Sequence, residues 1–133
     1  MRIFLDTNVL VSAVATRGLC ADVLRECLIH HQLIISNPLI KELEGALRKK
    51  LDVPESLISE FIEVLQKESV FSTPSSLPDI EIKDKDDLAI LSCALNGEAY
   101  LFVTGDNELL GLKKIGKMEI VSPRAFWEKL KTK

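Results

Sequence analysis

The sequence predicts a three-layer α/β/α fold, with helices on both faces of a central, mostly parallel sheet of four to five strands. Short apolar segments alternate with segments of helical period along the 133 residues, which is typical of parallel sheets. The apolar segments run continuously instead of alternating with polar residues, as in strands buried on both faces. Hydrophobic residues make up 47% of the chain and aromatic residues 5%, enough for one aliphatic core. We therefore expect a single domain over residues 1–133.

In the first half of the chain, each apolar strand is followed by helical segments. The polar triplet Asp6-Thr7-Asn8 ends the first strand, and residues 9–15 fit either a helix or a continuing apolar turn. Asn37-Pro38 is a typical helix start, with Asn as N-cap and Pro at the first helical position. We expect strands at residues 2–5 and 32–36, and helices at residues 9–15, 19–30, 37–51 and 55–67.

The second half repeats this order after a break. Residues 73–83 contain two prolines and a Ser-Ser pair, which favours a loop. A helix then begins at Asp84 or Asp86 and ends at Gly97. We expect strands at residues 70–72, 100–104 and 119–121, and further helices at residues 107–112 and 123–130.

Composition excludes several classes of protein. No apolar run reaches the roughly 18 residues of a membrane span, and the acid at position 6 interrupts the only candidate for a signal peptide. We expect a cytoplasmic protein without membrane contact. The three cysteines include no Cys-x-x-Cys pair, which argues against a disulfide framework or a zinc knuckle.

The net charge of −3 is unusual for a nucleic-acid-binding protein. Setting aside the four acids proposed below makes the balance nearly neutral, and bound divalent ions would change the local sign. Charge therefore neither favours nor excludes RNA. Lys113 and Lys114 are our preferred RNA-steering residues, and Lys41, Arg48, Lys49 and Lys50 are further candidates for phosphate contact. A solvated helix face is the default interpretation of Lys41 and the other basic residues near the end of its helix.

Two acids directly follow predicted buried strands. Asp6 comes after the strand at residues 2–5, and Asp106 after the strand at residues 100–104. Ligands bind at the carboxyl edge of open α/β sheets. Two carboxylates about a hundred residues apart in sequence are therefore expected to meet there.

Two further acids lie on helices that start at the same edge. Glu42 is in the second turn of the helix after the second strand, beside apolar positions that face the core. Asp87 is in the first turn of its helix, in register with Ile90 and Leu91. Asp84 lies one turn earlier and is the second choice for the third acid, whereas Asp86 is expected to point elsewhere.

Four convergent carboxylates would raise one another's pKa values by repulsion. Divalent cations remove this repulsion, and carboxylate oxygens suit Mg²⁺ or Mn²⁺. One or two such ions activate water and stabilise the charge of a phosphodiester undergoing hydrolysis. The site therefore predicts phosphodiester chemistry without a Ser, Cys or His nucleophile.

Each acid also has a structural interpretation, so only the whole set of acids indicates a metal site. Asp6 and Asp106 are equally suited to capping the helices that follow them. Glu42 alone fits a solvated helix residue. The rival functions are a metal-dependent phosphatase with an aspartyl nucleophile and a non-catalytic binding module. The phosphatase is disfavoured because no acid lies two residues after Asp6.

Four segments resemble, in order, the sequence blocks of the PIN domain (PilT N-terminus) nuclease family. They are Asp6-Thr7-Asn8-Val9-Leu10, the segment from Ser36 to Leu43 with Glu42, the segment from Asp84 to Ala94, and Val103-Thr104-Gly105-Asp106-Asn107-Glu108-Leu109-Leu110. Three matching residues would mean little, but four blocks in order cover the chain nearly end to end.

The resemblance implies a metal-dependent endoribonuclease similar to the PIN-type toxins of prokaryotic toxin–antitoxin pairs. By position, Asp6, Glu42, Asp87 and Asp106 would bind the metal, and Asn8 and Thr104 would hydrogen-bond these carboxylates. The resemblance further implies RNA as substrate, a cognate antitoxin as partner, and a homodimer.

Overall fold

A six-stranded sheet forms the centre of the computed structural model, which describes residues 1–74 and 81–131. The strand order is β3-β2-β1-β4-β6-β5, and every neighbouring pair is parallel except β5 with β6. Most of the loop expected at residues 73–83 lies outside the described residues. The strands are β1 (Arg2–Leu5), β2 (Gln32–Ser36), β3 (Val70–Ser72), β4 (Leu101–Val103), β5 (Lys114–Ile115) and β6 (Met118–Val121).

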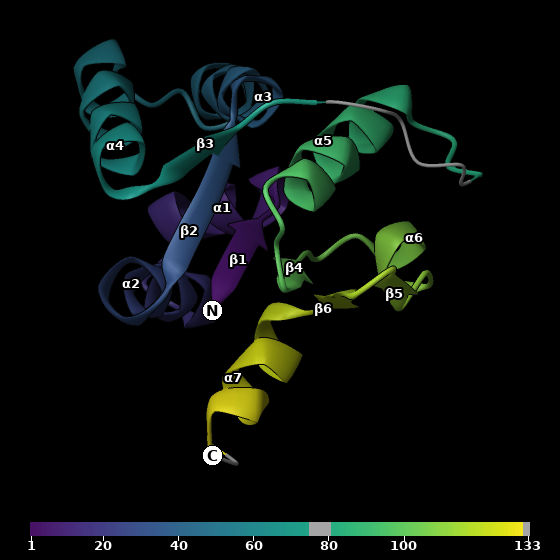
Figure 1. Ribbon diagram of the computed structural model, residues 1–133. Helices are drawn as coiled ribbons and strands as arrows, with labels where there is room; N and C mark the ends of the chain where they lie inside the picture. The colour runs from purple at the N-terminus through teal and green to yellow at the C-terminus, as the bar shows by residue number, and fades with distance from the viewer. Residues whose placement is uncertain (75–80, 132–133) are drawn as a thin grey trace.

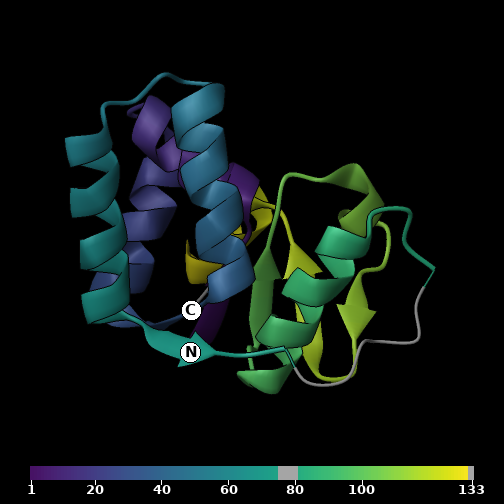
Figure 2. The ribbon, with the colours of Figure 1, turned by 90° about the horizontal axis from the view of Figure 1, so that it is seen from above.

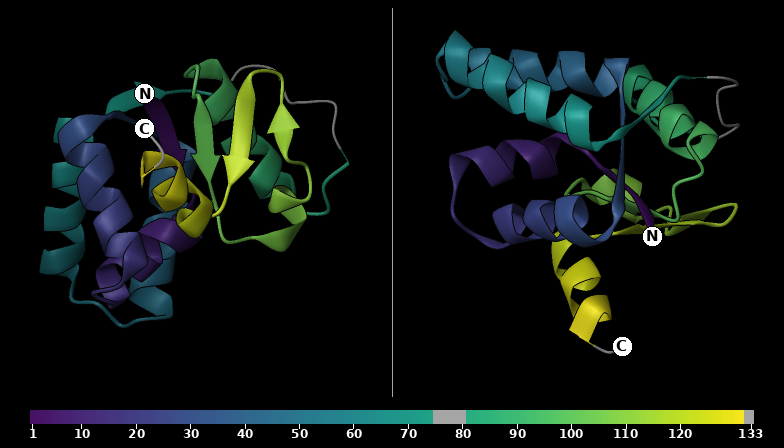
Figure 3. Two further views of the ribbon diagram at one scale, coloured as in Figure 1. Left: turned by 90° about the horizontal axis from the view of Figure 1, so that it is seen from below. Right: turned by 60° about the vertical axis from the view of Figure 1, so that its left-hand side comes forward.

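Helices cover both faces of this sheet, which confirms the predicted α/β class. Helix α5 lies on one face, and α7 lies on the opposite face (Figures 1 and 3). Helices α1 to α4 gather at the β2 and β3 side of the molecule (Figure 2). The helices are α1 (Thr7–Ala15), α2 (Leu19–His30), α3 (Asn37–Lys49), α4 (Glu55–Glu68), α5 (Lys85–Asn96), α6 (Asn107–Leu110) and α7 (Pro123–Lys131).

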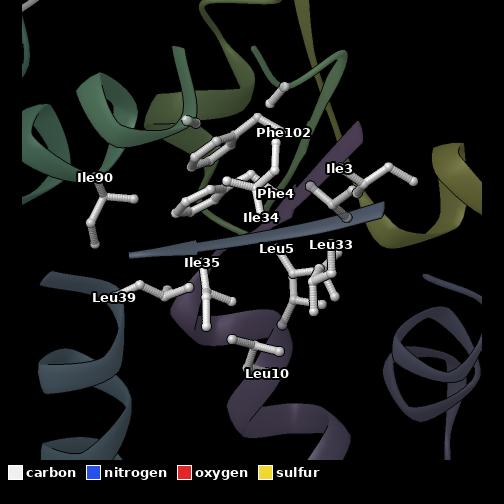
Figure 4. Close-up of a cluster of buried hydrophobic side chains, with 14 of the residues drawn as sticks. Ile3, Phe4, Leu5, Leu10, Leu33, Ile34, Ile35, Leu39, Ile90 and Phe102 are labelled. Atoms are coloured by element: carbon white, nitrogen blue, oxygen red, sulfur yellow. The ribbon is translucent and has the colours of Figure 1, made fainter. Parts of the chain in front are cut away.

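The register of the central strands sorts the core onto two faces. Phe4, Ile34 and Phe102 are paired neighbours, so they point to the same face, and the rings of Phe4 and Phe102 stack with centroids 5.3 Å apart. Figure 4 shows these rings on the side of Ile90, whereas Leu10 lies across the sheet. Both faces are thus buried, as the unbroken apolar character of the strands predicts.

The prediction of four to five strands is wrong, because the sheet has six strands and the short strand β5 was not expected. Its two residues pair antiparallel with β6 across a two-residue loop, Gly116-Lys117. Gly116 has φ 58°, a left-handed conformation that tight hairpin loops require and glycine adopts freely. The glycine is a usable hairpin signal, but a strand of two residues has no detectable apolar pattern.

The N-cap of α3 is also one residue earlier than predicted. Ser36, not Asn37, is the capping residue, and its buried hydroxyl accepts a hydrogen bond from the backbone N–H of Leu39 at 3.3 Å. Asn37 is the first helical residue, and its side chain is not needed for the cap. This position leaves the amide of Asn37 exposed on the surface.

Close side chains from β2 and β3 explain the glycine at the end of α5. A Cβ atom at Gly97 would lie 2.8 Å from Cγ2 of Ile34 and 3.1 Å from Cβ of Ser72. The carbonyl of Gly97 also accepts a hydrogen bond from Nε of Arg2 at 2.8 Å. A side chain at this position would force α5 or these neighbours to shift, so glycine favours the close packing of the end of α5 against β2 and β3.

No single helix in residues 1–74 and 81–131 is long and apolar enough to cross a bilayer. Helices α1 and α2 meet the length and composition test only as a pair, and the chain bends by 110° between them.

The strand order places a switch point in the middle of the sheet. From β1 the chain moves outward through β2 and β3, and then returns to the other side of β1 to form β4. A crevice forms at the carboxyl ends of the two strands that flank such a point. Asp6 follows β1 and Asp106 closely follows β4, so both acids lie at this crevice.

Candidate active site

Asp6 is held at the end of β1 by three donors. It is 4% exposed and is the N-cap of α1. Its Oδ1 accepts a hydrogen bond from the backbone N–H of Thr7 at 2.8 Å. Its Oδ2 accepts from Oγ1 of Thr104 at 2.8 Å and from Nδ2 of Asn8 at 3.2 Å. These bonds fix the orientation of a nearly buried carboxylate.

The ends of β1 and β4 are joined through Asn8 and Thr104. Asn8 donates to Oγ1 of Thr104 at 3.3 Å, and its Oδ1 accepts from the backbone N–H of Gly105 at 2.8 Å. Thr104 in turn accepts from the backbone N–H of Asp106 at 3.0 Å. Both expected hydrogen-bonding residues therefore contact Asp6, and both also position the segment that carries Asp106.

Asp106 both caps a helix and faces the crevice. Its Oδ1 accepts from the backbone N–H of Glu108 at 2.8 Å, which makes it the N-cap of α6. Asp6 likewise caps a helix, α1, and faces the crevice. The structural and functional interpretations of these acids are thus compatible, because a carboxylate has two oxygens.

Glu42 reaches the crevice from the second turn of α3. Its Oε1 accepts a hydrogen bond from Oγ1 of Thr7 at 2.8 Å. Thr7 lies directly after Asp6, so one triplet orients two acids from different elements. No role for Thr7 was predicted from the sequence, although its position between Asp6 and Asn8 could have indicated one.

The acids at the start of α5 do not all line the same surface: two line the crevice at the switch point, and one lines a neighbouring groove. Asp84 is the N-cap, with its Oδ1 accepting from the backbone N–H of Asp86 at 2.9 Å. Asp84 and Asp87 line the crevice, whereas Asp86 lines a neighbouring groove. Asp87 makes no side-chain hydrogen bond within the described part of the chain.

Together these side chains surround an open cleft of about 390 Å³. All five proposed metal-binding acids line it, and none of them forms an ion pair among the described residues. The lining residues are Asp6, Thr7, Asn8, Val11, Ser12, Glu42, Ala46, Lys50, Asp84, Asp87 and Asp106.

Burial and mutual repulsion raise the pKa values of three of the acids. Burial raises the pKa of Asp6, although hydrogen bonds from Thr104 and Thr7 partly oppose it. Burial also raises the pKa of Glu42, again opposed by Thr7. Burial first, and then the negative charges of neighbouring acids, together raise the pKa of Asp87 to about 7. These neighbouring acids are Asp6, Asp84, Asp106 and Glu42.

The chemistry of these donors fits a divalent cation, but the side chains are not gathered around one point. Unpaired carboxylates with raised pKa values are stabilised by positive charge. However, in the described residues no three His, Cys, Asp or Glu side chains lie close enough together to hold an ion. A cation could be held only if these side chains rotate, and Asp87 is the least constrained of them because its carboxylate has no hydrogen bond to another described residue.

The sequence of this chain matches a known family over most of its length. Residues 2–108 match the PIN domain, and this range contains every acid of the cleft. The chain belongs to the PIN domain family.

Solved structures of other proteins share this fold. One is a chain of VapBC2 from Rickettsia felis bound to a DNA fragment from their promoter, 19% identical, covering 92% of this chain and 98% of that chain, with a TM-score of 0.66. Another is a chain of VapBC-1 from nontypeable Haemophilus influenzae. It is 19% identical, the match covers 93% of this chain and 99% of that chain, and the TM-score is 0.64. At this identity the likeness shows the fold alone. A comparison with curated protein sequences found no match.

The lysines that line the cleft and its neighbouring groove in this PIN domain are not the pair preferred from the sequence for steering RNA. Lys113 and Lys114 are exposed at the β5 hairpin and do not line the acidic cleft. Lys50 lines the cleft, and Lys41 lines the adjoining groove. Lys50 follows Glu42 by eight residues, a spacing that returns to the same helix face and could have indicated its position.

Proposed function

We propose that this PIN domain is a metal-dependent endoribonuclease. The observation that carries the proposal is the cleft at the switch point, which five carboxylates line, none of them in an ion pair with a described residue, and where the pKa of Asp87 is raised to about 7. A protein tolerates such uncompensated repulsion at a functional site more often than elsewhere. Membership of the PIN domain family, whose members are generally nucleases, supports the same conclusion.

The proposed cofactor is Mg²⁺ or Mn²⁺, as one or two ions. Asp6, Glu42, Asp87 and Asp106 would hold it, with Asp84 as a further ligand. When bound, it supplies activation of a water molecule and stabilisation of the charge on the phosphate.

The polar residues of the cleft limit the motion of these acids. Thr104 and Asn8 hold the carboxylate of Asp6, and Thr7 holds that of Glu42. Groups that hydrogen-bond metal ligands typically change metal affinity or activity by about 10–100-fold when removed. We therefore assign Thr7, Asn8 and Thr104 the role of positioning residues.

The proposed biological setting is a toxin–antitoxin pair, in which this chain is the toxin. The support is the resemblance of its sequence blocks to PIN-type toxins and the fold that it shares with chains of two VapBC structures. An antitoxin as partner and a homodimer are part of this proposal. Co-expression with the product of a neighbouring gene tests it: we expect a stable complex, and two proteins that elute separately would contradict it.

The nuclease proposal is tested by incubating a labelled single-stranded RNA with the wild-type protein in Mg²⁺, in Mn²⁺ and in chelator. We expect internal cleavage with metal, none in chelator, and none by a folded Asp6→Asn variant. Hydrolysis of a small phosphomonoester without RNA cleavage would favour the phosphatase. Metal-independent RNA binding without cleavage would favour the binding module.

A further inference from the structure

The acidic cleft continues into a second hollow. A groove of about 560 Å³ adjoins it and shares the side chain of Glu42 as a wall. Besides Glu42, the residues that matter here are Asn37, Pro38, Lys41, Pro74 and Asp86. A linear ligand whose reacting group lies in the cleft therefore has room for its next unit in this groove.

One side of α3 runs past both hollows. Pro38, Glu42, Ala46 and Lys50 are spaced by four residues, so they form a single stripe on the helix surface. Pro38 lines the groove, Glu42 lines both hollows, and Ala46 and Lys50 line the cleft. Twelve residues of helix span about 18 Å. The two hollows are thus successive parts of one track along α3.

The groove has the composition of a site for a flat, polar-edged ring. Pro38 and Pro74 supply apolar surface, and Asn37 and Asp86 supply an amide and a carboxylate. Neither of these polar side chains makes a hydrogen bond within the described part of the chain, because Ser36 caps α3 and Asp84 caps α5. Both are exposed and able to meet a ligand.

The charges of the groove favour a base over a phosphate. Two carboxylates, Glu42 and Asp86, and one lysine, Lys41, line it, so negative groups outnumber positive ones. Beside the two carboxylates a phosphate is repelled, whereas an amino group can donate hydrogen bonds to them. Adenine, cytosine and guanine carry an exocyclic amino group. Uracil has no amino group. Its one ring N–H lies between two carbonyl oxygens, and a carboxylate repels these oxygens.

Two lysines lie where the flanking phosphates of such a chain would pass. Lys41 lines the groove and Lys50 lines the cleft, and nine residues of α3 separate them, about 14 Å along the helix axis. Both are exposed, and neither is in an ion pair among the described residues. The neighbouring Arg48, in contrast, pairs with Glu44 and Glu55.

We propose that the groove beside the cleft binds the base of a nucleotide adjacent to the cleaved phosphate, with preference for an amino-bearing base, while Lys41 and Lys50 bind the backbone phosphates on either side. The proposal deepens the nuclease function and rests on it. It assigns base reading to Asp86 and Asn37, and backbone binding to the two lysines.

The backbone part is tested by fluorescence anisotropy of a labelled single-stranded RNA at several salt concentrations, in Ca²⁺. Lys41→Ala and Lys50→Ala should each weaken binding and reduce the slope of log affinity against log salt by about 1. Lys49→Ala is the matched control, because Lys49 is exposed on the same helix and lines neither hollow. Wild-type affinity and slope in both variants would overturn this assignment.

The base part is tested with oligo(C), oligo(A) and oligo(U) of equal length. The wild-type protein should bind the first two about tenfold more tightly than oligo(U), and Asp86→Asn should narrow this ratio, because an amide also donates to the carbonyl oxygens of uracil. Equal affinities in the wild type, or an unchanged ratio in the variant, would overturn it. Circular dichroism of each variant confirms that it folds.

These binding measurements separate the two proposals. Failure of the wild type to cleave RNA in any metal would contradict the nuclease alone, whereas affinities independent of the groove residues would contradict the subsite alone. If the variants bind RNA normally but lose a co-purifying protein partner, the groove belongs to that partner and the subsite proposal is wrong.

Discussion

Thr104 donates a hydrogen bond to Asp6 at 2.8 Å across 98 residues of sequence. Because the same hydroxyl accepts from the backbone N–H of Asp106 at 3.0 Å, one oxygen atom connects the ends of β1 and β4. Thr104 is fully buried, so no water replaces it. The relative position of two proposed metal-binding acids thus depends on a neutral residue.

Replacing Thr104 by valine should destabilise the protein and weaken metal-dependent cleavage. The shape is conserved, but Asp6 loses a donor and Asp106 loses an acceptor in a buried setting, which costs about 1–3 kcal/mol. Denaturant unfolding measures the stability. The Mn²⁺ concentration that gives half-maximal cleavage measures how well the site uses the metal. Thr104→Ser keeps the hydroxyl and should retain most of both. A valine variant with wild-type values in both assays would contradict the role of this hydroxyl.

The N-cap of α3 offers a test that separates two neighbouring residues. Ser36→Ala should lower the free energy of unfolding by about 1 kcal/mol, because the N–H of Leu39 loses its acceptor. Asn37→Ala should change it little, since Asn37 is already helical and exposed. Urea unfolding of both variants measures the difference. A larger loss for Asn37→Ala would mean that the cap lies at the position first expected from the sequence.

Two glycine-to-alanine substitutions should act in opposite directions. Gly97→Ala places a methyl group 2.8 Å from Ile34 and should destabilise the fold by about 1–3 kcal/mol. Gly45→Ala lies inside α3, and apart from its chain neighbours and the nearby backbone of the same helix no atom lies within 4 Å of the added Cβ, so it should stabilise the protein by about 0.5–1 kcal/mol. Thermal unfolding of the pair checks this. Similar shifts of the same sign would show that the close approach at α5 is absent.

Stability without metal should depend on pH through Asp87. Its pKa is raised from 3.8 to about 7 on folding. The native state therefore holds a proton that the unfolded state releases, and the stabilisation from this group is present below about pH 4 and lost as pH rises toward 7. Asp87→Asn should therefore gain stability relative to wild type as pH rises from about 4 to 8.

This comparison is made by urea unfolding in chelator at several pH values. A difference between the two proteins that does not change with pH would contradict the raised pKa. Glu108→Gln serves as the control, because Glu108 is an exposed carboxylate in the first turn of α6 that does not line the cleft.

The sequence predicted the layers of helix and sheet, and the edge of the sheet at which the site lies, because both depend on local patterns. Continuous apolar strands and helices of regular period indicate a parallel sheet, and acids directly after strands must lie at its carboxyl edge. The hydrogen bond from Thr7 to Glu42 could not be predicted in the same way, since it joins α1 and α3, whose packing depends on the whole core.

Single-residue shifts and side-chain directions were the least predictable features. Ser36 and Asn37 are both good capping residues, and only the end of β2 decides between them. Among the lysines, proximity to Asp106 in sequence favoured Lys113 and Lys114, but the hairpin places them away from the cleft. Lys50 lines it because of its helical spacing from Glu42.

The most direct test of the carboxylate site is a calorimetric titration with Mn²⁺ of the wild type, Asp6→Asn, Asp87→Asn and the control Glu108→Gln. We expect binding by the wild type and the control, and a loss of affinity on the order of tenfold or more in the two Asp variants. Equal affinities in all four proteins, or no binding by the folded wild type, would contradict a metal site in this cleft.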